Sequence, residues 1–171
     1  MKKINLIFFF LILTNFANAE DKVVYLDVNY LLSESEVGKY VNSNLKKIND
    51  DNNKLFKNFE IELKSDEEKL LAQQNILKKD DYEKKISELK NKFKSYQDKK
   101  NIKNKELNFL RNNAGNIILK NINEIMSEYS KNNSISLVIQ KQSIIIGKTE
   151  LDVTNDILEL LNKKITKLEL K

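Results

Sequence analysis

The residues of this chain that could carry out catalysis are few. The 171 residues contain no cysteine and no histidine, so the usual nucleophile, the usual general base near neutral pH and the soft metal ligands are absent. Three glycines are too few for a glycine-rich phosphate loop. Two carboxylate pairs, Asp50-Asp51 and Asp80-Asp81, lie where we expect solvated helix and turn. We therefore expect a binding protein without a cofactor or metal, and not an enzyme.

The elements that hold these side chains are dominated by one long polar stretch. Between Gly38 and Gly115 lie 76 residues without a glycine, and the chain has no proline. Because these two residue types are the usual breaks in regular structure, the stretch predicts very long helix. A chain of this size cannot bury so much helix in one core. We expect the helix to project from a small body.

The first nineteen residues predict a cleaved signal peptide. Lys2 and Lys3 form a basic start, residues 4–16 are almost wholly apolar, and Ala17-Asn18-Ala19 has the small-residue pattern of a cleavage site. The apolar run is shorter than the roughly 20 residues that span a bilayer, although an uncleaved anchor is the alternative. Without the two lysines the net charge of +5 falls to +3. We expect a secreted, mildly basic protein.

Apolar residues in the long stretch recur with the spacing of a coiled coil. Steps of three and four residues form two successive seams, with polar residues at Asn52, Lys100 and Lys103. The first seam contains Val41, Leu45, Ile48, Leu55, Phe59, Leu63, Leu70 and Leu77. The second seam contains Tyr82, Ile86, Leu89, Phe93, Tyr96, Leu107, Leu110, Ala114 and Ile117.

A change of phase between the two seams predicts a helical hairpin. Asp80 or Asp81 could cap a second helix, and we place the tip of the hairpin at residues 77–82. Each helix would then contain roughly 40 residues and extend about 60 Å. One unbroken helix of twice that length is the alternative.

Strand signals lie at both ends of the chain. Residues 22–27, 135–140 and 143–146 are rich in β-branched residues and predict three strands. Ser33 or Ser35 should cap the first long helix, and Thr154 should cap a closing helix. The predicted fold is mostly α, with a small β body (residues 20–40 and 132–171) that carries the hairpin arm (residues 41–131). Three strands with exposed edges are marginal alone, which predicts self-association. The strand residues expected to form that contact are Val23, Tyr25, Leu137, Ile139, Ile144 and Ile146.

Both ends of the chain resemble the Skp (OmpH) family of periplasmic chaperones. The start that carries the resemblance is Val23-Val24-Tyr25-Leu26-Asp27-Val28, followed by Leu31-Leu32-Ser33-Glu34-Ser35 and Gly38-Lys39. The more specific match is the ending Leu151-Asp152-Val153-Thr154-Asn155-Asp156-Ile157-Leu158, preceded by Leu137-Val138-Ile139 and Ile144-Ile145-Ile146. The arm resembles the family only in length, charge and periodicity. Relatives often carry Gly, Ser or Pro near the tip, whereas Lys78 to Asp81 contains none.

The resemblance implies a homotrimer whose strands form a central β body. Three hairpins would extend from this body around a cavity. It also implies an ATP-independent holdase of the periplasm, which binds unfolded outer-membrane β-barrel proteins and prevents their aggregation in transit. Contact with anionic membrane lipid or lipopolysaccharide is a further expectation.

Lysines and aromatic residues of the distal arm are the candidates for client contact. From Lys84 to Lys105, nine lysines against two acidic residues give a local charge of +7. This charge either attracts acidic clients and anionic surfaces or only solvates the helix, and most of the aromatics should pack in the seam. The candidate residues are Lys78, Lys79, Tyr82, Lys84, Lys85, Lys90, Lys92 and Lys94.

Two other functions compete with this interpretation. A structural or adaptor coiled coil of the cell envelope would share the hairpin, but it would need a second folded domain or an anchor. Nucleic-acid binding has weaker grounds, since the net charge is small and Arg111 is the single arginine.

Overall fold

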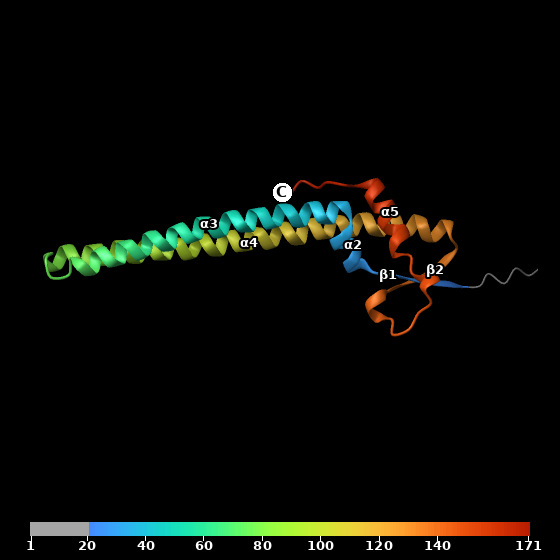
Figure 1. The fold of residues 1–171 in the computed structure, drawn as a ribbon, viewed down its shortest axis with the longest axis horizontal. Coiled ribbons are helices and arrows are strands. Elements are labelled where there is room, and N and C mark those ends of the chain that lie inside the picture. The colour runs from blue at the N-terminus through green and yellow to red at the C-terminus, as the bar shows by residue number, and fades with distance from the viewer. Residues whose placement is uncertain (1–20) are drawn as a thin grey trace, which may run out of the picture.

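The structure is a computed structural model that describes residues 21–171, and it shows a long helical hairpin attached to a small body (Figure 1). The expected signal peptide lies outside the described residues. The mostly helical fold class with a small sheet, predicted from the sequence, is confirmed. The elements in order are β1 (Lys22–Leu26), α2 (Val28–Glu34), α3 (Glu36–Ala72), α4 (Lys79–Asn132), β2 (Ile135–Gln140), the 3₁₀ turns η1 (Lys141–Ser143) and η2 (Thr149–Leu151), and α5 (Thr154–Lys164).

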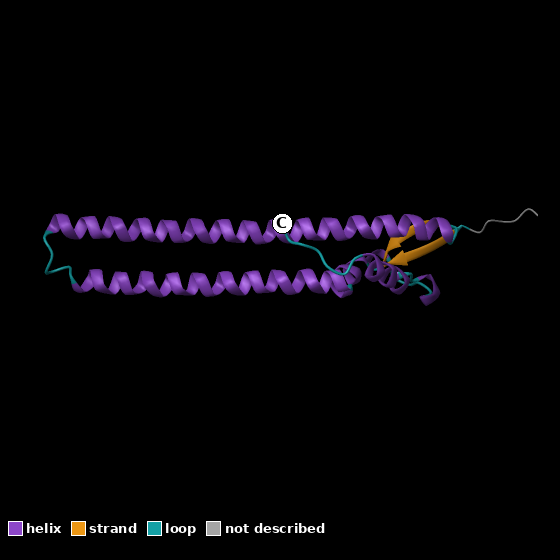
Figure 2. Cartoon of the chain, turned by 90° about the horizontal axis from the view of Figure 1, so that it is seen from above, coloured by secondary structure: helices purple, strands orange, loops and turns teal. Residues whose placement is uncertain are grey.

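The arm consists of α3 and α4, which lie side by side in both views (Figures 1 and 2). Helix α3 has 37 residues and α4 has 54. The extra length of α4 runs past the start of α3 and becomes part of the body. Ser35 caps α3, because its hydroxyl accepts a hydrogen bond from the Gly38 amide at 3.1 Å. Of the two serines considered, Ser35 is therefore the cap.

The turn at the tip of the arm begins four residues earlier than predicted. Helix α3 ends at Ala72, and residues 73–78 connect it to α4. Lys78 occupies the N-cap position without a side-chain hydrogen bond, so neither Asp80 nor Asp81 is the cap. Both acidic residues lie in the first turn of α4, where negative charge suits the helix dipole.

The seam between the helices differs from the predicted one at three places. Phe56 is buried where Leu55 was expected, Ile118 is buried where Ile117 was expected, and Phe93 is 49% exposed. The reason is the mismatch between a straight helix and a strict heptad, which drifts by about 20° per heptad. A second step of four residues, as from Asn52 to Phe56, resets the seam.

The strands β1 and β2 pair in a two-stranded parallel sheet. Val23 pairs with Leu137, and Tyr25 pairs with Ile139. A parallel pair needs a long crossover, which the whole hairpin provides. The third strand predicted at residues 143–146 is wrong: η1 ends at Ser143 and the residues after it join no strand. In the described chain, nothing lies beside them as a strand partner.

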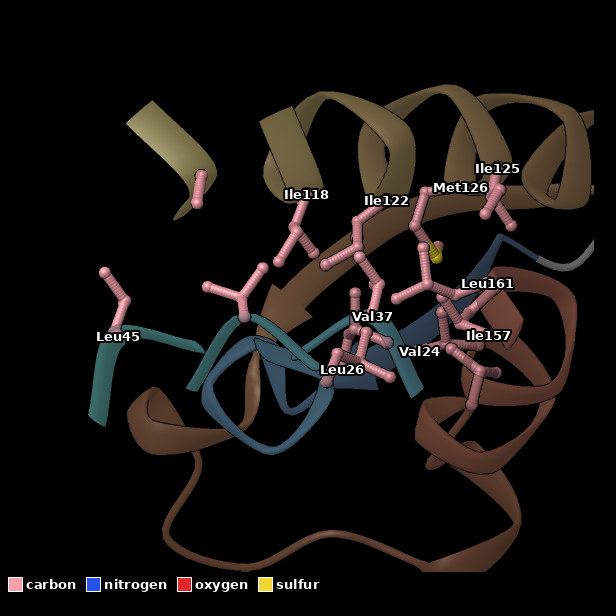
Figure 3. Packing of buried hydrophobic residues seen from close by; sticks show 14 of the residues in the cluster. Val24, Leu26, Val37, Leu45, Ile118, Ile122, Ile125, Met126, Ile157 and Leu161 are labelled. Carbon is pink, nitrogen blue, oxygen red and sulfur yellow. The ribbon is translucent and has the colours of Figure 1, made fainter. Parts of the chain in front are cut away.

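The hydrophobic core lies in the body, where β1, α2, α5 and the adjoining ends of α3 and α4 converge (Figure 3). The most deeply buried side chains come from different elements. Leu31, Val37, Ile157 and Leu161 are each 0% exposed, and Ile122 of α4 is 1% exposed. The core therefore fastens both ends of the chain to the base of the arm.

Thr154 does not cap α5 as predicted. It is the first residue of that helix, and the N-cap is Val153. The Thr154 hydroxyl instead accepts a hydrogen bond from the Asp27 amide at 2.9 Å and donates one to the Asp152 carboxylate. The buried hydroxyl thus joins α5 to the end of β1.

Candidate functional site

The sheet has one apolar face that the body covers only in part. Val24 and Leu26 point into the core, so their neighbours Val23 and Tyr25 point away from it. On this outer face Val23 is 37% exposed and Leu137 is 53% exposed. Ile139 is half-buried and Tyr25 is buried. The ladder therefore places four of the six predicted contact residues on one face.

The segment after η1 carries the other two predicted contact residues. Ile144 is half-buried, whereas Ile146 is 91% exposed and its neighbour Ile145 is 99% exposed. Sequence reasoning did not select Ile145, although it lies in the same β-branched run. Three consecutive isoleucines with two in water form a strongly apolar surface beside the sheet.

Tyr25 holds this segment against the sheet. Its hydroxyl donates to the Lys148 carbonyl at 3.1 Å. Its ring lies against Gly147, where an added Cβ would be 2.9 Å from the Tyr25 ring. The glycine therefore permits the close approach of the segment to the sheet.

The C-terminal motif, residues 151–158, joins β1 to α5 through hydrogen bonds. The Val153 amide donates to the Tyr25 carbonyl at 3.0 Å, and the Lys141 ammonium contacts the Asp152 carboxylate at 2.7 Å. Burial alone would raise the pKa of Asp152, but the hydrogen bonds from Lys141 and Thr154 outweigh it and lower that pKa. The same carboxylate raises the pKa of Lys141. The motif is thus explained by packing and hydrogen bonding within one chain.

Three of the seven predicted client-binding lysines have a partner in the arm. Lys85 donates to the Gln73 side chain at 2.6 Å, and Lys79 lies 4.0 Å from Glu83. Lys92 bridges to Asp66 at 2.6 Å and Glu62 at 3.3 Å on α3. The hydrogen bond to Asp66 is the main cause of the raised pKa of Lys92 and, in turn, of the lowered pKa of Asp66. Lys92 thus helps to join the two helices.

The remaining predicted lysines are exposed and make no ion pair within residues 21–171. They are Lys78, Lys84, Lys90 and Lys94. The local charge of +7 is reduced by acidic residues of α3 and of the start of α4, which the count from Lys84 to Lys105 leaves out. Residues 57–105 contain fourteen lysines and ten acidic residues, a net charge of +4. The distal arm is basic, though less so than one helix suggests.

An aromatic cluster lies in the middle of the arm. The rings of Phe56 and Tyr96 meet edge to face at 6.1 Å, and Phe93 lies 6.2 Å from Tyr96. The Lys100 ammonium lies 5.3 Å from the Tyr96 ring. The Tyr96 hydroxyl donates to the Glu60 carboxylate, which is the main cause of the lowered pKa of Glu60. Tyr82, predicted to contact clients, is instead half-buried near the tip.

A hollow with a largely apolar surface lies beside this cluster. It has a volume of about 460 Å³. Apolar side chains from both helices line it, including Leu63, Leu89 and the exposed Phe93. The charged residues at its wall are Glu60, Lys64, Glu67 and Lys90. Such a hollow could accept an apolar side chain of a bound polypeptide. Sequence reasoning placed Phe93 in the seam, and the drift of the helix turns it outward.

Comparison with known proteins agrees with this architecture. Residues 22–161 match the family described as outer membrane protein (OmpH-like). The chain belongs to the OmpH-like family. A Skp-like protein of Pseudomonas aeruginosa is 28% identical over 152 residues, which cover 86% of this chain and 88% of that protein. A solved structure from Caulobacter crescentus, described as an OmpH-like outer membrane chaperone, has a TM-score of 0.80 at 19% identity. That match covers 87% of this chain and 88% of the other.

The OmpH-like family is a family of chaperones and not a class of enzymes. Within residues 21–171, no three His, Cys, Asp or Glu side chains come together in an arrangement that could hold a metal ion. None of the helices described is long and apolar enough to cross a membrane.

Proposed function

We propose that this OmpH-like chain is an ATP-independent periplasmic holdase that binds unfolded outer-membrane β-barrel proteins and prevents their aggregation. The observation that carries the proposal is the hollow on the arm, where Phe93 remains in water beside an apolar wall. A spacer gains nothing from an exposed aromatic ring at that place. The family membership and the Skp-like relative support the same class of function.

The holdase acts as a homotrimer in this proposal. The outer face of the sheet leaves Val23 and Leu137 in water, and Ile145 and Ile146 extend the same apolar surface. Adjacent exposed apolar side chains of this kind mark interaction surfaces. Burying them against two further copies would place three arms around one shared space. Residues 144–146, which form no strand in one chain, would gain neighbours in the trimer.

Client contact would combine the hollows with the exposed lysines. A transmembrane β-strand alternates apolar and polar side chains, so its apolar residues can enter the hollow while its polar residues face the charged residues at the wall. Many weak contacts from several arms add through effective concentration. A holdase of this kind binds the unfolded client and not the folded one, so insertion into the membrane releases the client without ATP.

A prevention-of-aggregation assay tests the proposal. An unfolded outer-membrane barrel protein is diluted from urea, and its turbidity is followed with increasing amounts of this chain. A soluble unfolded protein serves as the control client. Suppression that is selective for the barrel protein is expected, and light scattering should give the mass of a trimer. Unchanged turbidity would remove the holdase function and favour a structural coiled coil of the envelope.

A matched pair of variants tests the hollow itself. Phe93→Ser removes the exposed ring at the hollow, whereas Phe109→Ser removes a ring of the same helix that is 62% exposed and lies outside the residues lining the hollow. We expect the first variant to suppress aggregation less well and the second to match the unmodified chain. Equal loss in both variants would indicate general surface stickiness and not a binding site.

A further inference from the structure

The C-terminal tail, residues 165–171, follows α5 and runs back along the base of the arm (Figures 1 and 2). Helix α5 ends where the Ile165 amide donates to the Leu161 carbonyl at 2.9 Å. The tail lies after residue 161, where the match to the OmpH-like family ends. Its contacts are therefore a feature of this chain that the family match does not explain.

The tail covers a strip of the proximal arm, called the groove here, and its residues 168–171 also line the hollow that remains between the tail and α3. Its Ile165, Leu168 and Leu170 side chains pack against the edge of the core. Residues 168–171 face a wall built by one side of α3. The backbone carbonyl of Lys171 accepts a hydrogen bond from the Asn113 side chain of α4 at 3.2 Å. The wall residues are Tyr40, Asn44, Lys47, Ile48 and Asp51.

The pattern of the tail shows what this groove accepts. Leu168 and Leu170 are half-buried, while Glu169 and Lys171 are exposed and pair with each other at 2.8 Å. An extended chain whose alternate residues are apolar is the pattern of a β-strand with one buried face. Transmembrane strands of barrel proteins have the same period of two.

We propose that the groove is a second client-contact site and that the tail occupies it as an internal competitor. The site would take an extended polypeptide segment with apolar residues at alternate positions. This inference rests on the proposed function for the class of client. The tail does not need ATP or a partner to leave, because a segment held by a few contacts opens at a low free energy. A segment with more apolar residues than Leu168 and Leu170 would displace it.

Competition predicts that removing the tail strengthens binding. The probe is a fluorescein-labelled peptide of eight residues in which Leu alternates with Ser or Lys, and its affinity is measured by fluorescence anisotropy. Truncation after Thr166 should tighten binding about fivefold or more, since a tethered competitor acts at a high effective concentration. The double variant L168S/L170S should give the same gain. The double variant E169S/K171S keeps both leucines and should match the full chain.

Two further measurements locate the site and distinguish competition by the tail from a folding defect. In the truncated chain, Tyr40→Ser should remove the gain, because Tyr40 lines the groove and is 37% exposed. The chain has no cysteine, so a probe at Glu169→Cys reports the tail alone, and saturating peptide should increase its mobility. Unchanged or weaker binding after truncation would overturn the proposal and leave the tail as a brace. Gain of peptide binding without suppression of barrel aggregation would instead contradict the proposed function.

Discussion

The body and the distal arm of this OmpH-like chain are built by different means. The body buries side chains from both ends of the chain, several of them completely, around α5 and β1. Between residues 46 and 106 the arm buries only Phe56, Leu70 and Tyr96. Half-buried apolar residues make up the rest of the seam, and exposed pairs such as Lys92 with Asp66 and Lys100 with Glu60 add contacts between the two helices.

The body therefore supplies most of the stability, and the distal arm is the part that can change shape. Exposed ion pairs contribute little each and are screened by salt, so the distal arm is held by many weak contacts. The body has the dense packing that resists change. The proposed holdase would benefit from this division, because the arm could adjust to a client while the body keeps its packing. Regions with few buried contacts also open with the lowest free energy.

The largest predicted effect is the loss of a leucine in the body. Leu161→Ala should lower the free energy of unfolding by about 2–5 kcal/mol, because a fully buried leucine leaves a cavity. Leu70→Ala in the arm should cost only about 1 kcal/mol, since water fills the gap. Urea unfolding followed by circular dichroism at fixed protein concentration measures both. Equal losses would contradict the contrast between body and arm, and Leu160→Ala, at 37% exposure, is the control for α5.

Two glycines give a second test with effects of opposite sign. An alanine Cβ at Gly38 would lie 2.2 Å from the Leu32 carbonyl oxygen, so α2 and α3 must separate. We expect Gly38→Ala to destabilise the chain by about 1–3 kcal/mol. Gly115 has nothing within 4 Å of such a Cβ, and Gly115→Ala should stabilise its helix by about 0.5–1 kcal/mol. The same unfolding measurement applies, and a gain at Gly38 would refute the close packing described there.

Lysines near the tip test whether charge in the arm serves clients. Replacing Lys78, Lys79, Lys84 and Lys85 with Ser should weaken capture of an unfolded barrel protein roughly three- to tenfold at low salt and flatten its salt dependence. Affinity measured between low and physiological ionic strength checks this. The control is Lys92→Ser, which removes a lysine already paired with α3 and should lower arm stability more than capture. If capture is unchanged over the whole salt range, the tip lysines only solvate the helix.

The smallest predicted effect is a single ionisation in the body. The Tyr129 hydroxyl of α4 donates a hydrogen bond to the Asp156 carboxylate of α5. This hydrogen bond raises the pKa of Tyr129 to about 12. A raised pKa favours the neutral hydroxyl, so the contact is fully present below pH 10 and is lost as the pH rises through about 12. Absorbance titration at alkaline pH should show one late tyrosine that Tyr129→Phe removes. If the unmodified chain shows no late-titrating tyrosine, the contact between Tyr129 and Asp156 does not persist in solution.

The sequence predicts the long helices well because their signal is repeated many times. Most turns from Val41 to Ala114 add an apolar residue to the pattern, so single exceptions such as Leu55 do not change the result. The strands at residues 22–27 and 135–140 were also found, since β-branched residues there are bounded by turn signals. The meeting of the two ends then followed from the topology of a hairpin.

Other features could not be found because their cause lies outside the local sequence. The tip contains no glycine or proline, and ordinary residues from Gln73 to Lys78 make the turn. The outward position of Phe93 depends on helix drift accumulated over several turns. The pairing of Lys92 with Asp66 depends on the register between two helices, which α4 alone does not determine.

The parallel pairing of β1 with β2 has a consequence for how the chain acquires its structure. Lys22 and Ile135 are partners in the sheet although 113 positions separate them, a contact order at which closing a loop through random coil is slow. An antiparallel hairpin shortens that search, since two helices of local contacts bring the partners to the same end. We therefore expect the helices to form before the sheet. β1 then stays unpaired until β2, residues 135–140, has been synthesised. Each newly made chain would be incompletely folded for a time before it could bind the unfolded clients proposed for it.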